Sequence, residues 1–103
     1  MPDSPVTFVN VFDVEPADQS ALVDLLTEAI DEVIRQRPGF VGARVLASDD
    51  GRTVINEATW TDAAAVAATQ ADPAAAGYAA RTAALATPRP GLYRVHSTAP
   101  RQR

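Results

Sequence analysis

The sequence predicts an α+β domain in which helices cover one face of an antiparallel sheet. Three observations predict it. Apolar and polar residues alternate along several short segments, which is typical of strands with one buried face. One long segment repeats its apolar residues three and four positions apart, which is typical of a helix packed on one side. An Asp-Gly pair between two alternating segments indicates a hairpin, so those strands run antiparallel.

Three strands are predicted within the first 60 residues, at residues 7–14, 40–47 and 53–60. Side chains on a strand point alternately to opposite faces. On that basis, Asn10 and Asn56 each lie in a row that is otherwise apolar. A carboxamide among buried apolar groups needs hydrogen-bond partners or costs about 1–3 kcal/mol. Each asparagine is therefore either satisfied by the protein itself or available to a ligand.

The first predicted helix lies between the first two strands. Asp18 or Ser20 can cap it, and it runs to about Arg37, where Pro38-Gly39 ends it. Its spacing gives it one apolar face. The residues of that face are Leu22, Leu25, Leu26, Ala29, Ile30, Val33 and Ile34.

The second helical region is rich in alanine and broken in two. Thr61 or Asp62 caps a short helix that ends near Ala71, and Asp72-Pro73 breaks it. A second helical run covers residues 74–86. Four of its residues share one face by their spacing. They are Ala74, Tyr78, Arg81 and Leu85.

The last predicted strand covers residues 92–98, after Pro88 and Pro90 interrupt the chain. The element order is therefore β-α-β-β-α-β, which is the ferredoxin-like topology with a four-stranded antiparallel sheet. Helices cover only one face of such a sheet. An apolar second face would need a partner sheet, so we expect a homodimer. The residues expected on that second face are Val9, Val11, Ile55, Tyr93 and Val95.

Composition limits the possible functions. We expect one domain over residues 1–103, with an ordered core at about 6–98 and short flexible ends. A net charge of −4 and nine scattered arginines without lysine argue against a nucleic-acid partner. There is no cysteine and one histidine, His96, which excludes disulfides, thiolate catalysis and metal sites built on several histidines of one chain. We expect His96 to be an ordinary surface or interface residue on the last strand.

Membrane and secretion signals are also missing from the sequence. No apolar run reaches the roughly 20 residues of a membrane span. The start, MPDSPVTF, lacks the basic and apolar regions of a signal peptide. We therefore expect a cytoplasmic protein with no membrane partner.

Several motifs resemble the antibiotic biosynthesis monooxygenase domain family, within the dimeric α+β barrel superfamily. They are FVNVFDV in the first strand, RPGFVGARVL after the first helix, DDGRTVINEATWTD in the hairpin, and the break ADP. The resemblance covers about residues 6–97. It implies a ferredoxin-like chain that dimerises into an α+β barrel.

Two activities in this superfamily match different residues. Small cofactor-free oxygenases turn aromatic polyketide anthrones or phenols into quinones, and their third-strand asparagine and tryptophan match Asn56 and Trp60. Their helix arginine is most nearly matched by Arg81, a few residues displaced. Haem-degrading members use a strand asparagine and a tryptophan, matched by Asn10 and Trp60. They also use a helix histidine, which is Tyr78 here.

We therefore expect a monooxygenase without cofactor or metal that uses O₂ on an aromatic polyketide-type substrate. A deprotonated anthrone or phenol can reduce O₂ directly, so the protein need only bind it, stabilise its anion and exclude water. Haem binding and non-catalytic ligand binding are the alternatives. The expected catalytic residues are Asn56, Trp60 and Arg81. The expected substrate-binding residues are Asn10, Phe12 and Tyr78.

Overall fold

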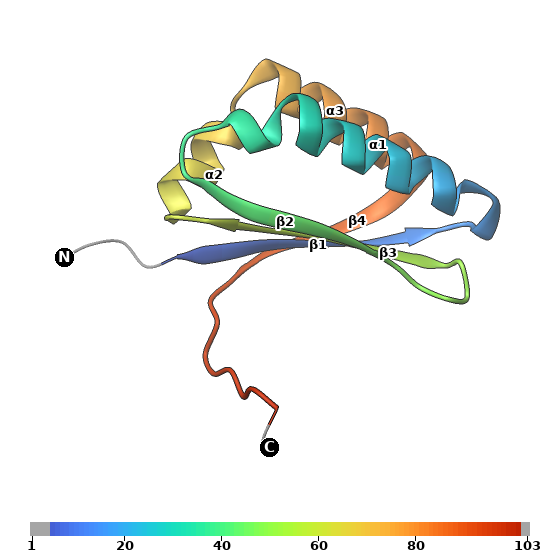
Figure 1. Ribbon diagram of the computed structural model, residues 1–103. Helices are drawn as coiled ribbons and strands as arrows, with labels where there is room; N and C mark the ends of the chain where they lie inside the picture. Colours follow the sequence, from blue (N-terminus) through green and yellow to red (C-terminus); the bar gives the residue numbers. More distant parts are fainter. Residues whose placement is uncertain (1–4, 102–103) are drawn as a thin grey trace.

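The computed structural model describes residues 5–101 and shows, within that range, helices stacked on one face of a single sheet (Figure 1). The main elements are β1 (Val6–Val14), α1 (Gln19–Glu32), β2 (Phe40–Ala47), β3 (Thr53–Trp60), α2 (Ala63–Gln70), α3 (Pro73–Leu85) and β4 (Ala86–Tyr93). Short 3-10 helices at Pro16–Asp18 and Ile34–Gln36 flank α1. The predicted flexible ends fall partly on residues 1–4 and 102–103, which lie outside the described range.

The strand order is β2-β3-β1-β4, and every neighbouring pair is antiparallel. This confirms the predicted ferredoxin-like α+β fold, with the second helical region divided into α2 and α3. The predicted bounds of β2 and β3 are confirmed, because a clear alternation and an Asp-Gly turn define both strands. In the turn, Gly51 has a φ of 80°, a value that glycine adopts without strain.

The prediction for the last strand is wrong. β4 begins at residue 86, includes Pro88 and Pro90, and ends at Tyr93. β4 is an edge strand, and prolines two residues apart place their ring nitrogens on the same side of it. On the outer side of an edge strand, a missing N–H breaks no hydrogen bond of the sheet. His96 consequently lies beyond β4, in the exposed segment that leaves the domain (Figure 1).

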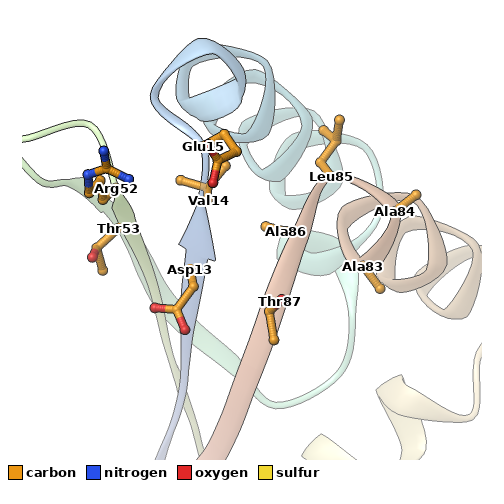
Figure 2. A pocket seen from close by; sticks show the side chains of 10 residues that line it. All are labelled: Asp13, Val14, Glu15, Arg52, Thr53, Ala83, Ala84, Leu85, Ala86 and Thr87. Carbon is orange, nitrogen blue, oxygen red and sulfur yellow. The ribbon is translucent and has the colours of Figure 1, made fainter.

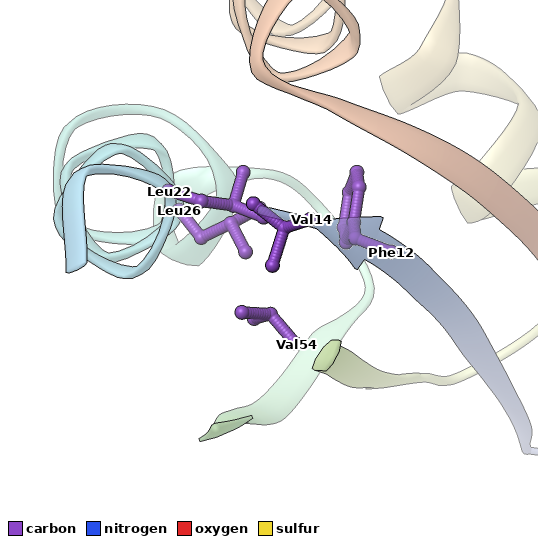
Figure 3. Packing of buried hydrophobic residues seen from close by; sticks show 5 residues of the cluster. All are labelled: Phe12, Val14, Leu22, Leu26 and Val54. Atoms are coloured by element: carbon purple, nitrogen blue, oxygen red, sulfur yellow. The ribbon is translucent and has the colours of Figure 1, made fainter. Parts of the chain in front are cut away.

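Two buried clusters hold the helices on the sheet. At one end, α1 packs against β1 and β3 through the residues shown in Figure 3, which are Phe12, Val14, Leu22, Leu26 and Val54. At the other end, α2 packs on the same strands through Val6, Ala58, Trp60 and Val66. Burying each large side chain stabilises the fold by roughly 1.5–3 kcal/mol. Along β3, Asn56 lies between the two clusters.

Capping residues and one close contact fix the position of α2. Asp62 caps it, as predicted, by accepting a hydrogen bond from the backbone N–H of Ala65 at 2.8 Å. Ala65 also packs directly against Gly39, where a Cβ would lie only 2.5 Å from the Ala65 Cβ. The φ of Gly39 is +88°, so any other residue there would be strained as well as crowded. The helix therefore has little freedom to shift along the sheet.

The second sheet face carries the apolar residues that the strand patterns predict. By the register of β1 with β3 and β4, Val9, Val11, Ile55 and Tyr93 all point away from the helices. Val95 lies beyond β4 and is exposed. Among residues 5–101, no helix is both long and apolar enough to cross a membrane.

Candidate active site

A cavity of about 310 Å³ lies between the sheet and the helices, with walls from β1, β3 and all three α-helices. Its volume is at the lower end of the roughly 300–1,000 Å³ typical of small-molecule sites. Most of its surface comes from apolar side chains. The larger ones are Phe8, Phe12, Leu26, Ile30, Ile34, Trp60 and Val66.

Small residues on α3 leave the room that the cavity occupies. Ala75, Ala76 and Ala79 line the cavity where longer side chains would fill it. The cavity is thus compact and shaped for an apolar ligand with few polar groups.

Two asparagines form the polar part of the floor. Asn10 of β1 and Asn56 of β3 are direct partners in the antiparallel register, and both line the cavity. The Oδ1 atoms of both are buried and accept no hydrogen bond from any residue between 5 and 101. Side chains opposite each other on antiparallel strands have Cβ atoms about 4.5–5.5 Å apart. The two amides therefore face the same part of any bound molecule.

The two unpartnered Oδ1 atoms have an energetic cost that folding alone does not explain. A buried polar atom without a partner destabilises the protein by about 1–3 kcal/mol, and an apolar residue of similar shape would avoid this. The sequence left two possibilities for each asparagine, hydrogen bonds within the protein or hydrogen bonds to a ligand. Within residues 5–101, no protein group bonds either Oδ1 atom. Their position favours the other possibility, a ligand that supplies the missing hydrogen bonds.

Trp60 provides a rigid aromatic wall beside the asparagines. It lies on the same face of β3 as Asn56, four residues away, and only 3% of its surface is exposed. The ring of Phe40 meets it edge to face, with centroids 5.5 Å apart and an interplanar angle of 80°. Packing of this kind fixes the plane of the indole. Asn10, Phe12, Asn56 and Trp60 are thus the predicted site residues that the structure brings together.

Tyr78 and Arg81 lie elsewhere, in an exposed cluster that bridges α1 and α3. The Tyr78 hydroxyl donates a hydrogen bond to Glu28 Oε2 at 2.6 Å, and this bond raises the pKa of Tyr78. An Arg81 nitrogen lies 3.7 Å from the same oxygen, and its guanidinium lies over the Tyr78 ring at 5.2 Å from the centroid. Neither residue belongs to the cavity lining. Their predicted roles in catalysis and binding stay predictions.

Thr69 of α2 is a cavity residue that the sequence did not reveal. It is 5% exposed, and its buried Oγ1 has no hydrogen-bond partner among the described residues. Like the two asparagines, Thr69 belongs to the cavity lining. Residue type gives no signal here, because threonine in an alanine-rich helix is unremarkable. Its spacing of three from Val66, on the inward face of α2, is the only trace of its role in the sequence.

The chemistry offered by the lining is hydrogen bonding and aromatic contact. Of the described residues that line the cavity, none has an ionisable side chain. Residues 5–101 also contain no group of three or more histidine, aspartate or glutamate side chains placed to hold a metal ion. Amides in an apolar, water-poor site can stabilise a developing negative charge strongly.

A second depression lies at the far end of β1 and is shown in Figure 2. It is larger, about 540 Å³, and more open to solvent than the cavity between the sheet and the helices. Its charged residues have both signs and include Asp13, Glu15 and Arg52. Asp13 already forms an ion pair with Arg89. None of the buried unpartnered atoms of residues 5–101 lies there, so the cavity between the sheet and the helices is the stronger candidate for the active site.

Comparisons with known proteins identify the family of this chain. The family model of the antibiotic biosynthesis monooxygenase matches residues 5–81. Tetracenomycin-F1 monooxygenase of Streptomyces glaucescens is 45% identical over 67 residues, which are 65% of this chain and 60% of that protein. The matched part of the chain thus spans less than two thirds of that relative.

Two solved structures cover nearly the whole chain. SnoaB, a cofactor-independent oxygenase from Streptomyces nogalater, is 30% identical with a TM-score of 0.77, over 95% of this chain and 99% of that one. The monooxygenase ActVA-Orf6 of Streptomyces coelicolor, solved with nanaomycin D, is 31% identical with a TM-score of 0.82, over 95% and 94%. These relatives agree with the predicted class of enzyme, a monooxygenase. The chain belongs to the antibiotic biosynthesis monooxygenase family.

Proposed function

We propose that this protein is a cofactor-independent monooxygenase that uses O₂ to convert a compact aromatic polyketide-type anthrone or phenol into a quinone. One observation carries the proposal: Asn10 and Asn56 lie side by side on the floor of an apolar cavity, and the Oδ1 atom of each is buried without a hydrogen-bond partner among residues 5–101. The relatives support the class of reaction, because SnoaB is described as a cofactor-independent oxygenase and the tetracenomycin relative as a monooxygenase.

Binding would rest on the shape and polarity of the cavity. A flat ring system fits against the fixed indole of Trp60, with Phe12 and the α1 side chains covering its other apolar surfaces. Oxygen atoms at its edge would face Asn10 and Asn56. A carboxamide can accept a hydrogen bond from a phenolic O–H through Oδ1 and donate to an oxyanion through Nδ2. The same pair can therefore serve the substrate before and after it loses a proton.

The electrons of the reaction come from the substrate. Loss of a methylene proton to water gives an anthrone anion, which transfers one electron to O₂. The resulting radical and superoxide combine, and after protonation the peroxide loses water. One oxygen atom remains as the new quinone carbonyl, and the other leaves in water together with the two methylene hydrogens. Substrate and O₂ balance as quinone and water, so no added reductant is needed.

The contribution of the protein is electrostatic. Asn56 and Asn10 would donate amide N–H groups to the oxygen on which negative charge develops. A donor of this kind in an enclosed site typically contributes about a hundredfold to a thousandfold in rate. Without an ionisable side chain in the lining, proton removal would fall to water or hydroxide. Stabilising the anion would lower the pKa of the substrate.

The haem alternative gains no support from the contacts of Tyr78. A tyrosine that ligates haem iron must be deprotonated. Here the Tyr78 hydroxyl is bonded to the Glu28 carboxylate, which raises its pKa and disfavours the tyrosinate. Arg81, the predicted catalytic cation, is engaged by the same carboxylate, so its role would require it to leave Glu28.

We also propose that two copies of the chain pair through the uncovered sheet faces. Apolar residues on that face support this, among them Val9, Val11, Ile55 and the largely exposed Tyr93. Sedimentation should then give a particle of about 22 kDa, twice the 10.9 kDa of one chain, at micromolar concentration. A monomer at that concentration would contradict the pairing.

Oxygen uptake tests the activity directly. Protein treated with a chelator is mixed with dithranol, a dihydroxyanthrone, while an oxygen electrode and the quinone absorbance are followed together. We expect protein-dependent uptake with one quinone formed for each O₂ consumed. Uptake no faster than the spontaneous oxidation would favour the non-catalytic binding alternative. A hemin titration that produces a Soret band would reopen the haem alternative.

A further inference from the structure

The three helical threonines use their hydroxyls in different ways. Thr27 in α1 donates to the carbonyl oxygen of Val23 at 2.8 Å, and Thr82 in α3 donates to that of Ala79 at 2.9 Å. Such bonds to the preceding turn are the usual way to satisfy a threonine within a helix. Thr69 makes none within the described chain, although its Oγ1 is buried. Its hydroxyl therefore lacks the partner that the other two have.

Thr69 approaches the cavity from the side opposite the asparagines. Asn10 and Asn56 belong to the sheet, whereas Thr69 belongs to α2, and all three contribute to the lining. The position of α2 is fixed by its cap and by the contact of Ala65 with Gly39. A β-branched side chain also has few rotamers within a helix. Threonine divides between two rotamers within a helix because one of them lets Oγ1 bond the preceding turn, and the Thr69 Oγ1 makes no such bond.

Valine would fill the same space without the polar atom. Because a buried hydroxyl without a partner destabilises the fold, threonine at this position is not explained by packing. Val66, three residues earlier on the inward face of α2, shows that an apolar branched residue is accommodated on this face. A ligand group is the partner that would account for the hydroxyl.

We infer that Thr69 is a third polar contact to the substrate and selects aromatic ligands that carry an oxygen on the side facing α2. The inference rests on the proposed function, since it assumes the same aromatic ligand in the same cavity. A hydroxyl can donate to a carbonyl oxygen or accept from a phenolic O–H. A ring system with oxygens on two sides would satisfy the sheet amides and Thr69 at once, and an unsubstituted hydrocarbon would satisfy none of them.

Trp60 makes the test possible without turnover. It is the only tryptophan of the chain, and it lines the cavity, so its fluorescence reports occupancy. A dihydroxyanthraquinone serves as a stable, product-like probe, and anthracene, the flat hydrocarbon of the same ring system, serves as the probe without oxygen atoms. Both are titrated into the wild type, Thr69→Val and Thr69→Ser. Thr27→Val, on an exposed position of α1, is the control for loss of a helical hydroxyl outside the cavity.

We expect Thr69→Val to bind the dihydroxyanthraquinone about threefold to tenfold more weakly, since it loses one hydrogen bond. The ratio of its affinities for the dihydroxyanthraquinone and for anthracene should fall by the same factor, because anthracene has no oxygen to bond Thr69. Thr69→Ser and Thr27→Val should stay within about twofold of the wild type. The melting temperature of Thr69→Val should be raised by about 4 °C or more, because an unpartnered buried hydroxyl is removed.

The outcomes separate the inference from the proposed function. Unchanged affinity in Thr69→Val, or a lower melting temperature, would overturn the role of Thr69 and leave the oxygenase proposal standing. Binding with the expected Thr69 effect, but no oxygen uptake with dithranol, would remove the oxygenase activity alone. Failure of the wild type to bind the dihydroxyanthraquinone would count against both.

Discussion

Replacing Asn56 with leucine should make the protein more stable and much less active. Leucine has nearly the shape of asparagine, so Asn56→Leu removes the amide without opening a void. In the wild type, the Asn56 Oδ1 is buried and unpartnered, which costs about 1–3 kcal/mol. The variant should recover much of that free energy of unfolding. For a domain of this size, each 1 kcal/mol raises the melting temperature by about 4–8 °C.

Activity should move in the opposite direction. If the Asn56 amide stabilises the substrate anion, its loss should lower kcat/KM for dithranol by about a hundredfold to a thousandfold. That factor corresponds to roughly 2.7–4 kcal/mol of transition-state stabilisation. Asn10 faces the same part of the ligand, so the double variant with Asn10→Leu should lose less than the product of the two separate effects.

Val54→Ala provides the matched control. Val54 lies two residues away on the same face of β3, has no exposed surface and does not line the cavity. It should lose about 2 kcal/mol of stability while keeping its activity at a temperature where it is folded. Chemical denaturation and oxygen uptake would be measured on all variants. An Asn56→Leu protein that is both less stable and fully active would refute the reasoning, because the amide would then be structural.

Three further predictions follow from the cavity and its surroundings. Because no ionisable side chain lines the cavity in the described chain, kcat/KM should rise with pH along the titration of the substrate. An inflection between about pH 6 and 9 that stays at the same pH for substrates of different pKa would contradict this. Ala79→Leu should fill part of the cavity and weaken dihydroxyanthraquinone binding at least about tenfold in a fluorescence titration; unchanged affinity would place the ligand elsewhere. Asp72→Ala removes the cap of α3 and the contact with Arg37 at 3.4 Å, so urea denaturation should show a loss of about 1–2 kcal/mol, and equal stability would argue against the cap.

Much of the fold could be predicted because local patterns and tertiary structure agree along most of the chain. β2 and β3 have both the alternation and the turn that strands of a hairpin need. β4 could not be placed, because Pro88 and Pro90 are typical of a loop and are also tolerated in an edge strand. The sequence does not tell which strand lies at the edge.

Only part of the candidate site could be predicted from the sequence, because the rest depends on how the strands and helices pair. The parity of each strand placed Asn10 and Asn56 on apolar rows, but their pairing depends on the register between β1 and β3. On α3, alanine occurs on every side, so the periodicity could not distinguish the buried face. Tyr78 and Arg81 proved to face Glu28, while Ala75, Ala76 and Ala79 line the cavity.

The fate of the oxygen atoms shows whether the protein is an oxygenase that needs no cofactor. Chelator-treated protein would be given dithranol under isotopically labelled O₂ in ordinary water, and the quinone analysed by mass spectrometry at early times. We expect quinone whose formation depends on the protein and that carries one labelled oxygen per molecule, and we expect much less of it with Asn56→Leu. Quinone whose new oxygen comes from water, or labelled product that forms equally fast without the protein, would contradict this expectation.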